Sequence, residues 1–187
     1  MSFISSFPKV TSIAYLFNQF PETGEPVCAY TQELLRGPSP FTIAERELIA
    51  AFVSALNQCD FCHNTHMQTA LAYGLDEELL SALLEDIDTA PIDSRLRPVL
   101  HYVKKLTQIP SRMVQADADA VFAAGWNEAA LYHAVSVCGL FNFYNRLVEG
   151  IGIRLTPEDS ESHARTTGQW LHDNGYLLEQ LRTRLRN

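Results

Sequence analysis

Basic residues are scarce in this chain of 187 residues, in which 14 Lys and Arg stand against 22 Asp and Glu for a formal net charge of −8. No run of Lys or Arg rises above this low background. A nucleic-acid-binding surface needs clustered positive charge. The composition therefore argues against a nucleic acid as a partner.

Long apolar runs are missing as well. No stretch reaches the roughly 18 apolar residues that mark a candidate membrane-spanning helix. The opening residues, MSFISSFPKV, lack the charged-then-apolar layout of a signal peptide. We therefore expect no membrane partner and a location in the cytoplasm.

Cysteine is sparse and unevenly placed. The chain has four, and two of them form a CxxC pair, Cys59 and Cys62. Small secreted domains that depend on disulfides carry a denser framework of cysteines. We expect the other two, Cys28 and Cys138, to be inert residues of the core.

The strict alternation of apolar and polar residues that is typical of a strand is also absent. Apolar residues make up 47% of the chain and recur at helical spacing. We predict an all-α protein that forms one domain, residues 1–187. It would have a CxxC-bearing half at about 12–90, a thiol-free half at about 93–153 and a polar helical tail at 156–187. The expected helices cover residues 12–20, 26–35, 42–57, 59–74, 76–86, 93–109, 116–124 and 127–150, with a break near 175 in the tail.

An internal repeat would relate the two halves. A shift of 83 residues lays Glu45 on Glu128, and the two cysteines then fall on Asn142 and Asn145. Such matches are also easy to find between two unrelated apolar helices. The sequence thus leaves two fused structural repeats as an open alternative.

The most informative stretch runs from Glu47 to His66 and reads ELIAAFVSALNQCDFCHNTH. Positions i, i+3 and i+7 share one face of an α-helix, so Cys59, Cys62 and His66 would point the same way. Glu47 lies twelve residues before Cys59, on the apolar helix that leads in. Two thiols, an imidazole and a carboxylate so close together suit redox chemistry or a metal.

Redox chemistry accounts for the spacing of the two thiols. A thiol reacts with a peroxide as its thiolate, and a helix N-terminus and a neighbouring protonated histidine both lower a cysteine pKa. After the attack, a second thiol one turn away can condense with the sulfenic acid to a disulfide. The departing oxygen must also receive a proton, and such general acid catalysis is worth roughly 10²–10⁴-fold.

Zinc is the main alternative. Cys59, Cys62 and His66 could be three zinc ligands, with Glu47 or His133 as the fourth. A structural site usually draws its other ligands from a second recognisable knuckle, and the sequence shows none. A zinc-binding or redox-sensing module is therefore kept as the alternative, and the favoured interpretation needs neither a metal nor a cofactor.

The pattern Glu-x11-Cys-x2-Cys-x3-His resembles the AhpD-like proteins of the carboxymuconolactone decarboxylase superfamily, above all their two-repeat, peroxidase-related branch. The later run LFNFYNRLVEGIGI, residues 140–153, also resembles sequences of that branch. The resemblance spans roughly residues 17–153, and its specific part is the stretch 47–66. It implies an AhpD-like helical bundle, a homo-oligomer and thiol-dependent reduction of hydroperoxides.

The resemblance also implies roles for the motif residues. Cys62 would be the peroxidatic thiol, and Cys59 its proton donor and resolving partner. Glu47 and His66 would form a proton relay. The best-studied members carry a histidine immediately before the second cysteine, where this chain has Phe61.

We expect no catalytic role for two further histidines, His63 and His133. His63 does not replace the missing family histidine, because it lies beyond Cys62 at a different helical angle, and we expect it at the rim of the site or on the surface. His133, within an apolar helix, is expected to be a core histidine.

The partners that follow are an organic or hydrogen peroxide as substrate and an external dithiol as reductant, for which a lipoyl- or thioredoxin-like protein would fit. Further copies of the chain would complete a dimer or a trimer of dimers. Superfamily members that decarboxylate a lactone generally lack the cysteine pair, which makes a decarboxylase-like enzyme of other chemistry a weaker alternative to an antioxidant oxidoreductase.

Overall fold

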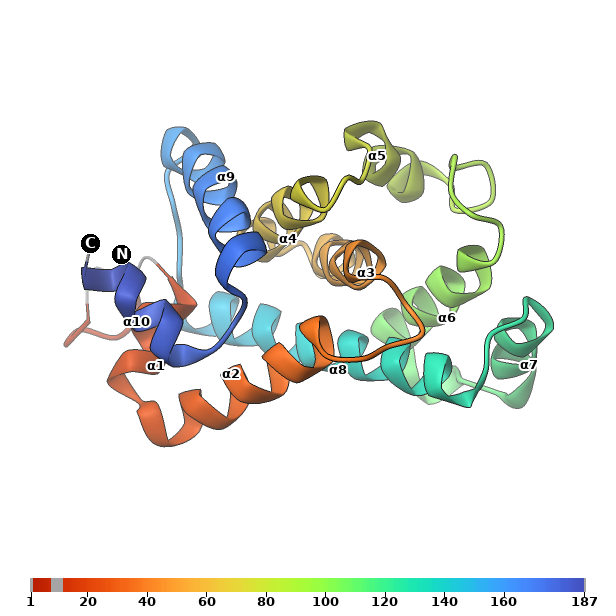
Figure 1. The fold of residues 1–187 in the computed structure, drawn as a ribbon, viewed down its shortest axis with the longest axis horizontal. Helices are drawn as coiled ribbons and strands as arrows, with labels where there is room; N and C mark the ends of the chain where they lie inside the picture. Colours follow the sequence, from red (N-terminus) through yellow and green to blue (C-terminus); the bar gives the residue numbers. More distant parts are fainter. Residues whose placement is uncertain (1, 8–11, 187) are drawn as a thin grey trace.

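The regular structure is helical throughout the described chain, as the sequence predicted (Figure 1). The structure, a computed structural model, describes residues 2–7 and 12–186 and contains no strand in these ranges. Its helices are α1 (Ile13–Gln19), α2 (Pro21–Arg36), α3 (Ile43–Leu56), α4 (Asp60–Ala72), α5 (Glu77–Glu85), α6 (Leu96–Gln108), α7 (Gln115–Ala123), α8 (Glu128–Ile151), α9 (Pro157–Asn174) and α10 (Leu178–Arg186), with a 3-10 turn at Pro110–Arg112.

The start of α3 follows from its sequence. Thr42 accepts a hydrogen bond from the Glu45 backbone, and the Glu45 carboxylate accepts one from the Thr42 backbone, which completes the predicted capping box. The start of α2 differs from the prediction, which put it at Pro26. Pro21 takes the first helical position, where no backbone N–H is needed. Pro26 then lies inside the helix but on its exposed side, where water can satisfy the freed carbonyl.

Helix α3 lies at the centre of the molecule and contacts α2, α4, α5, α6 and α8 (Figure 1). Every residue from Arg46 to Ser54 is consequently buried. Residues 57–59 turn the chain back so that α4 packs against α3, and Gln58 adopts a left-handed conformation with φ 57° in this turn. The turn places the cysteine-bearing end of α4 beside the last turns of α3.

The tail is more than a polar surface layer. Helix α9 packs along α4, while α10 contacts α1 and α2 (Figure 1). Several apolar residues of the tail are buried, among them Leu171, Tyr176 and Leu178. The prediction of surface helices missed this, because the composition of the tail is mostly polar and no local pattern shows which distant helices it packs against.

The shift of 83 residues does not superpose one helix pair on another. It would lay the turn between α3 and α4 onto residues 140–142, which lie within the continuous helix α8. One long helix cannot be the counterpart of a helical hairpin. The 83-residue shift therefore matches only the apolar residues of α3 with those of α8.

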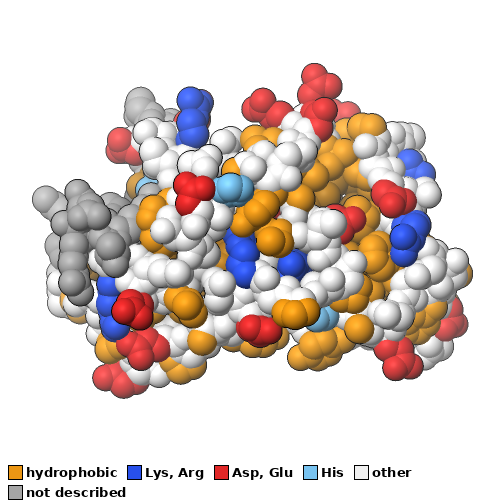
Figure 2. All heavy atoms as spheres, in the orientation of Figure 1, with side chains coloured by type: hydrophobic (Ala, Val, Ile, Leu, Met, Phe, Trp, Pro, Cys, Tyr) orange, Lys and Arg blue, Asp and Glu red, His pale blue; other side chains and the backbone are white. Residues whose placement is uncertain are grey.

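Charges are dispersed over the surface. On the face drawn in Figure 2, acidic groups occur above α5 and along α2, while Lys and Arg form small separate groups. Within the described chain, no helix combines the length and the apolar character needed to cross a bilayer.

Candidate active site

A cavity of about 270 Å³ opens beside the first turns of α4. Its walls come from α1, α2, α4, α8, α9 and α10, so segments from both ends of the chain enclose it. They include Ile13, Cys28, Thr31, Phe61, Cys62, His66, Tyr144, His163, Leu171 and Tyr176. None of the described residues that line the cavity is Asp, Glu, Lys or Arg.

The two cysteines of the motif are placed differently. Cys62 is in the first turn of α4, is 4% exposed and lines the cavity. Cys59 caps the start of α4, is fully buried and is not part of the cavity wall. A small molecule in the cavity therefore meets the sulfur of Cys62 before that of Cys59.

The pKa of the Cys62 thiol is raised well above its ordinary value. The hydrogen bond with Cys59 is the largest cause and burial is the next, while a hydrogen bond from Asn145 lowers the pKa without reversing the shift. The sequence predicted the opposite, because a helix N-terminus favours a thiolate. Burial next to a second thiol outweighs that effect, so at neutral pH Cys62 is a thiol that must lose its proton during the reaction.

The raised pKa predicts how alkylation of Cys62 depends on pH. Below its pKa, the thiolate fraction grows about tenfold per pH unit. We therefore expect the rate of alkylation by iodoacetamide, followed by mass spectrometry of the peptide, to keep rising from pH 7 to 9. Glutathione in the same tube is the reference, because an ordinary thiol begins to level off near pH ~8.5. If the alkylation rate of Cys62 levelled off at a lower pH than that of glutathione, the pKa of Cys62 would not be raised.

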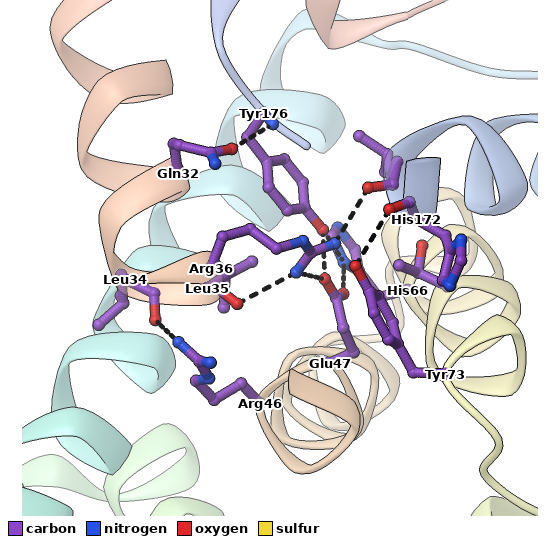
Figure 3. Close-up of polar contacts among 12 residues, drawn as sticks. Gln32, Leu34, Leu35, Arg36, Arg46, Glu47, His66, Tyr73, His172 and Tyr176 are labelled. Atoms are coloured by element: carbon purple, nitrogen blue, oxygen red, sulfur yellow. Dashed lines mark hydrogen bonds and ion pairs between the residues drawn. The ribbon is translucent and has the colours of Figure 1, made fainter. Parts of the chain in front are cut away.

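Glu47 is fully buried on α3 and is held by three side chains. Its Oε1 accepts from Arg36 Nη1 at 2.6 Å and from Tyr176 Oη at 2.6 Å, and its Oε2 lies 2.7 Å from His66 Nδ1 (Figure 3). Burial alone would raise the pKa of Glu47. The hydrogen bond and charge of His66, with Arg36 and Tyr176, outweigh it and lower the pKa. Glu47 is therefore a carboxylate, not an exposed surface acid.

His66 joins this carboxylate to the cavity. Because a carboxylate only accepts hydrogen bonds, its contact with Glu47 places the proton on Nδ1 and leaves Nε2 as the available nitrogen. The ring of Phe141 packs edge-on against the imidazole at 4.5 Å and limits its rotation. The contact between Glu47 and His66 that the sequence predicted is present, whereas their catalytic roles stay a prediction.

Arg36 and Tyr176 were missed at the sequence level. Arg36 is the last residue of α2, and Tyr176 follows the break at Gly175 in the tail. Neither belongs to a motif, and a single arginine or tyrosine near a helix end carries no signal of its own. Only the packing of α2 and the tail against α3 reveals them.

The remaining candidates lie in different places. Phe61 faces the cavity, and its ring lies 5.3 Å from that of His163 on α9. His63 is half-buried outside the cavity wall, with Nδ1 3.1 Å from the Ala51 carbonyl. Burial lowers the pKa of His133 on α8, and the charge of Arg46 nearby lowers it further.

The two other cysteines differ from each other. Cys138 is buried beside Thr107 and Asn142, which fits an inert core residue. Cys28 is buried too, and burial raises its pKa to about 12, but it forms part of the cavity wall.

The zinc alternative finds no ligand set. In residues 2–7 and 12–186, no three His, Cys, Asp or Glu side chains are grouped to hold a metal ion. Both oxygens of Glu47 and Nδ1 of His66 are already engaged. The motif thus has the geometry of a dithiol beside a carboxylate–imidazole pair.

Comparisons with known proteins indicate one family and one fold. Residues 21–105 match the model of the carboxymuconolactone decarboxylase family. No curated protein matches the chain. The crystal structure of an uncharacterized peroxidase-related protein from Silicibacter sp. TM1040 is similar, with a TM-score of 0.73 and 25% sequence identity. The match covers 82% of this chain and 80% of the Silicibacter chain.

Two further solved structures share the fold. An uncharacterized peroxidase-related protein with an alkylhydroperoxidase AhpD core, from Ralstonia eutropha JMP134, is 23% identical over 82% of this chain and 78% of its own, with a TM-score of 0.71. A protein of unknown function from Agrobacterium tumefaciens is 19% identical over 75% of this chain and 95% of its own, with a TM-score of 0.66.

Proposed function

Because the chain belongs to the carboxymuconolactone decarboxylase superfamily and has its AhpD-like fold, we propose that it is a thiol-dependent peroxidase that works through a dithiol–disulfide cycle. One observation carries the proposal. Cys62 lines the cavity, Cys59 lies behind it, and the His66–Glu47 pair reaches the same cavity.

The proposed reaction begins at the Cys62 sulfur. The sulfur attacks one oxygen of the hydroperoxide, the O–O bond breaks, and an alcohol leaves with the proton that the thiol gives up. In this mechanism His66, which lines the same cavity as Cys62, takes the thiol proton through Nε2 and returns it to the departing oxygen. The sulfur of Cys59 then attacks the Cys62 sulfenic acid, and water leaves as the disulfide forms.

The cavity favours a hydroperoxide with an uncharged, apolar body. Among the described residues, its lining is mostly aliphatic and aromatic, with a few hydroxyl groups, two thiols and two histidines, and none of them carries a fixed charge. A carboxylate of a lactone substrate would need a cationic partner in the wall, and none of the described lining residues is Arg or Lys. The same feature that suits an alkyl hydroperoxide therefore opposes the decarboxylase alternative.

Disulfide formation is the direct test of the proposed cycle. We expect one equivalent of cumene hydroperoxide to join Cys59 and Cys62, because the two lie one helical turn apart and in contact. Mass spectrometry should show the loss of two hydrogens from the peptide that carries both. A peptide with two free thiols, alongside oxidised Cys28 or Cys138, would rule the cycle out.

The buried position of the pair also bears on the reductant. An external dithiol must return two electrons to a buried disulfide whose Cys62 sulfur borders the cavity. A lipoyl group on a flexible arm fits this constraint better than a flat thioredoxin-like surface. We propose such a dithiol as the partner, in the cytoplasm, where reduced thiols are maintained.

We also propose that the chain forms a homo-oligomer, a dimer or a trimer of dimers. Most of the aromatic-rich stretch at residues 140–144 is not available for an interface, because Leu140, Phe141 and Tyr144 are buried within one chain. Phe143 of that stretch and Tyr132, both on α8, remain uncovered, at 45% and 63% exposure. They are eleven positions, or three turns, apart and so lie on one face.

Light scattering tests the oligomer. We expect a mass well above the 21.0 kDa of one chain at micromolar concentration, because burying two aromatic side chains of α8 against a second copy is favourable. The double variant Tyr132→Asp, Phe143→Asp should shift the equilibrium toward the single chain. A wild-type protein of 21.0 kDa would refute the proposal.

A further inference from the structure

The last turn of α9 and the segment that joins it to α10 are held to α2 by hydrogen bonds between α2 side chains and their backbone. The Leu171 carbonyl of α9 accepts a hydrogen bond from Arg36 Nη2 at 3.2 Å. After α9, the Tyr176 backbone N–H donates to Gln32 Oε1 at 2.7 Å (Figure 3). Gly175 between them has φ +76°, and a Cβ there would meet Gln32 Oε1 at 2.4 Å. Glycine adopts this positive φ without strain, and the turn it makes sets where the next side chain points.

That side chain, Tyr176, enters the site. Its Oη donates to Glu47 Oε1 at 2.6 Å and lies 3.3 Å from His66 Nδ1 (Figure 3). Its ring is nearly parallel to the His66 imidazole, with 13° between the planes, and lies 4.8 Å from the Arg36 guanidinium. The phenol thus contacts Arg36, Glu47 and His66, which together with Tyr176 form a buried polar cluster.

We propose that Tyr176 is a positioning residue for the Glu47–His66 pair, supplied to the site by the C-terminal segment; this inference rests on the proposed peroxidase function. The Tyr176 hydroxyl and Arg36 both donate to Oε1, so the carboxylate is held with Oε2 toward His66. This fixes the imidazole tautomer and directs Nε2 at the cavity. The site is therefore complete only when the α9–α10 segment is docked.

Charge supports the assignment. Arg36 and Glu47 compensate each other within the cluster, so the phenol has to add direction, not charge. Because burial and the Glu47 carboxylate raise the pKa of Tyr176 well above its ordinary value, the hydroxyl stays protonated and remains a hydrogen-bond donor.

Tyr73 provides a matched control. Its ring also lies against Arg36, at 5.0 Å, and its Oη donates to the His172 carbonyl of the same C-terminal segment at 3.1 Å (Figure 3). No hydrogen bond joins the described Tyr73 side chain to Glu47 or His66. Tyr73→Phe therefore removes a hydroxyl that holds the segment, whereas Tyr176→Phe also removes one that directs the pair.

The experiment compares Tyr176→Phe and Tyr73→Phe in the full chain. The first readout is the rate at which Cys62 forms a sulfenic acid with cumene hydroperoxide in a single turnover. The second is the proton resonance of His66 Nδ1–H in ¹⁵N-histidine-labelled protein, assigned with His66→Gln. A thermal melt of each variant reports docking and folding.

Tyr176→Phe should slow the oxidation of Cys62 by about 10-fold or more, the range known for partners that orient a histidine at metal sites. It should also move the Nδ1–H resonance. Tyr73→Phe should change the rate by less than about 2-fold and leave the resonance in place. A Tyr176→Phe rate within 2-fold of wild type, or equal losses in the two variants, would overturn the proposal.

The two readouts separate this inference from the proposed function. If no peroxide oxidises Cys62 in the wild-type chain, the proposed peroxidase function is wrong. The His66 Nδ1–H resonance alone then tests the positioning role of Tyr176. A resonance that moves only in Tyr176→Phe then supports the positioning role, and one that stays in place overturns it.

Discussion

Cys62→Ser is expected to abolish peroxide reduction, with turnover lower by roughly 10³-fold or more, because it removes the nucleophile of the covalent route. Cys59→Ser should behave differently. Cys62 still faces the cavity in that variant and can attack once, but no thiol is left to resolve its sulfenic acid. A sulfenic-acid probe should label Cys59→Ser stoichiometrically and leave Cys62→Ser unlabelled.

The control for this pair is Cys138→Ser, which removes a buried thiol outside the cavity. Its turnover should match that of wild type. Equal labelling of Cys59→Ser and Cys62→Ser would remove the assigned order of the two cysteines, because both sulfurs would then be accessible to the peroxide.

Glu47→Gln carries the second large effect. A glutamine cannot hold His66 Nδ1–H as a carboxylate does, so turnover should fall by roughly 10²-fold or more. The free energy of unfolding should also fall by about 3 kcal/mol, because the substitution leaves the Arg36 guanidinium buried without its counter-charge.

A double variant separates chemistry from folding. In Arg36→Met, Glu47→Gln no buried charge is left unpaired, so the free energy of unfolding should recover much of the loss while turnover stays low. Denaturant melts and peroxide turnover on the same preparations give both quantities. If turnover recovered with stability, Glu47 would be a structural residue and the chemistry would have to rest on His66 alone.

The ionisation of Glu47 bears on its predicted part in the proton relay. Its pKa is lowered in the folded protein and three donors hold it, so it stays ionised at neutral pH. Within the proposed mechanism we therefore expect Glu47 to hold the His66 Nδ1–H, and His66 to carry the proton to the leaving oxygen.

The ionised carboxylate makes stability depend on pH. A lowered folded-state pKa means that the stability contribution of Glu47 is complete above the unfolded value of ~4.3 and is lost as the pH falls through the folded value. The wild-type chain should consequently lose more stability below pH ~4 than the double variant does.

The sequence by itself determined the helices and the core of the site. Capping residues and apolar periodicity are local signals, and they placed α3 and α4 and the turn between them. Glu47 and His66 are only 19 residues apart on consecutive helices, so their contact follows once both helices form and pack. The spacing of Cys59, Cys62 and His66 is likewise fixed within a single helix.

Only the tertiary structure decided how that core is completed. Tyr176 reaches Glu47 across 129 residues of chain, from a tail whose polar composition gave no sign of a site. The cavity wall combines both ends of the chain, and the raised pKa of Cys62 comes from its hydrogen bond with Cys59 and from burial. The physical reason is the same in each case: long-range packing sets burial, charge compensation and hydrogen-bond direction, and no local pattern encodes which distant residue will supply them.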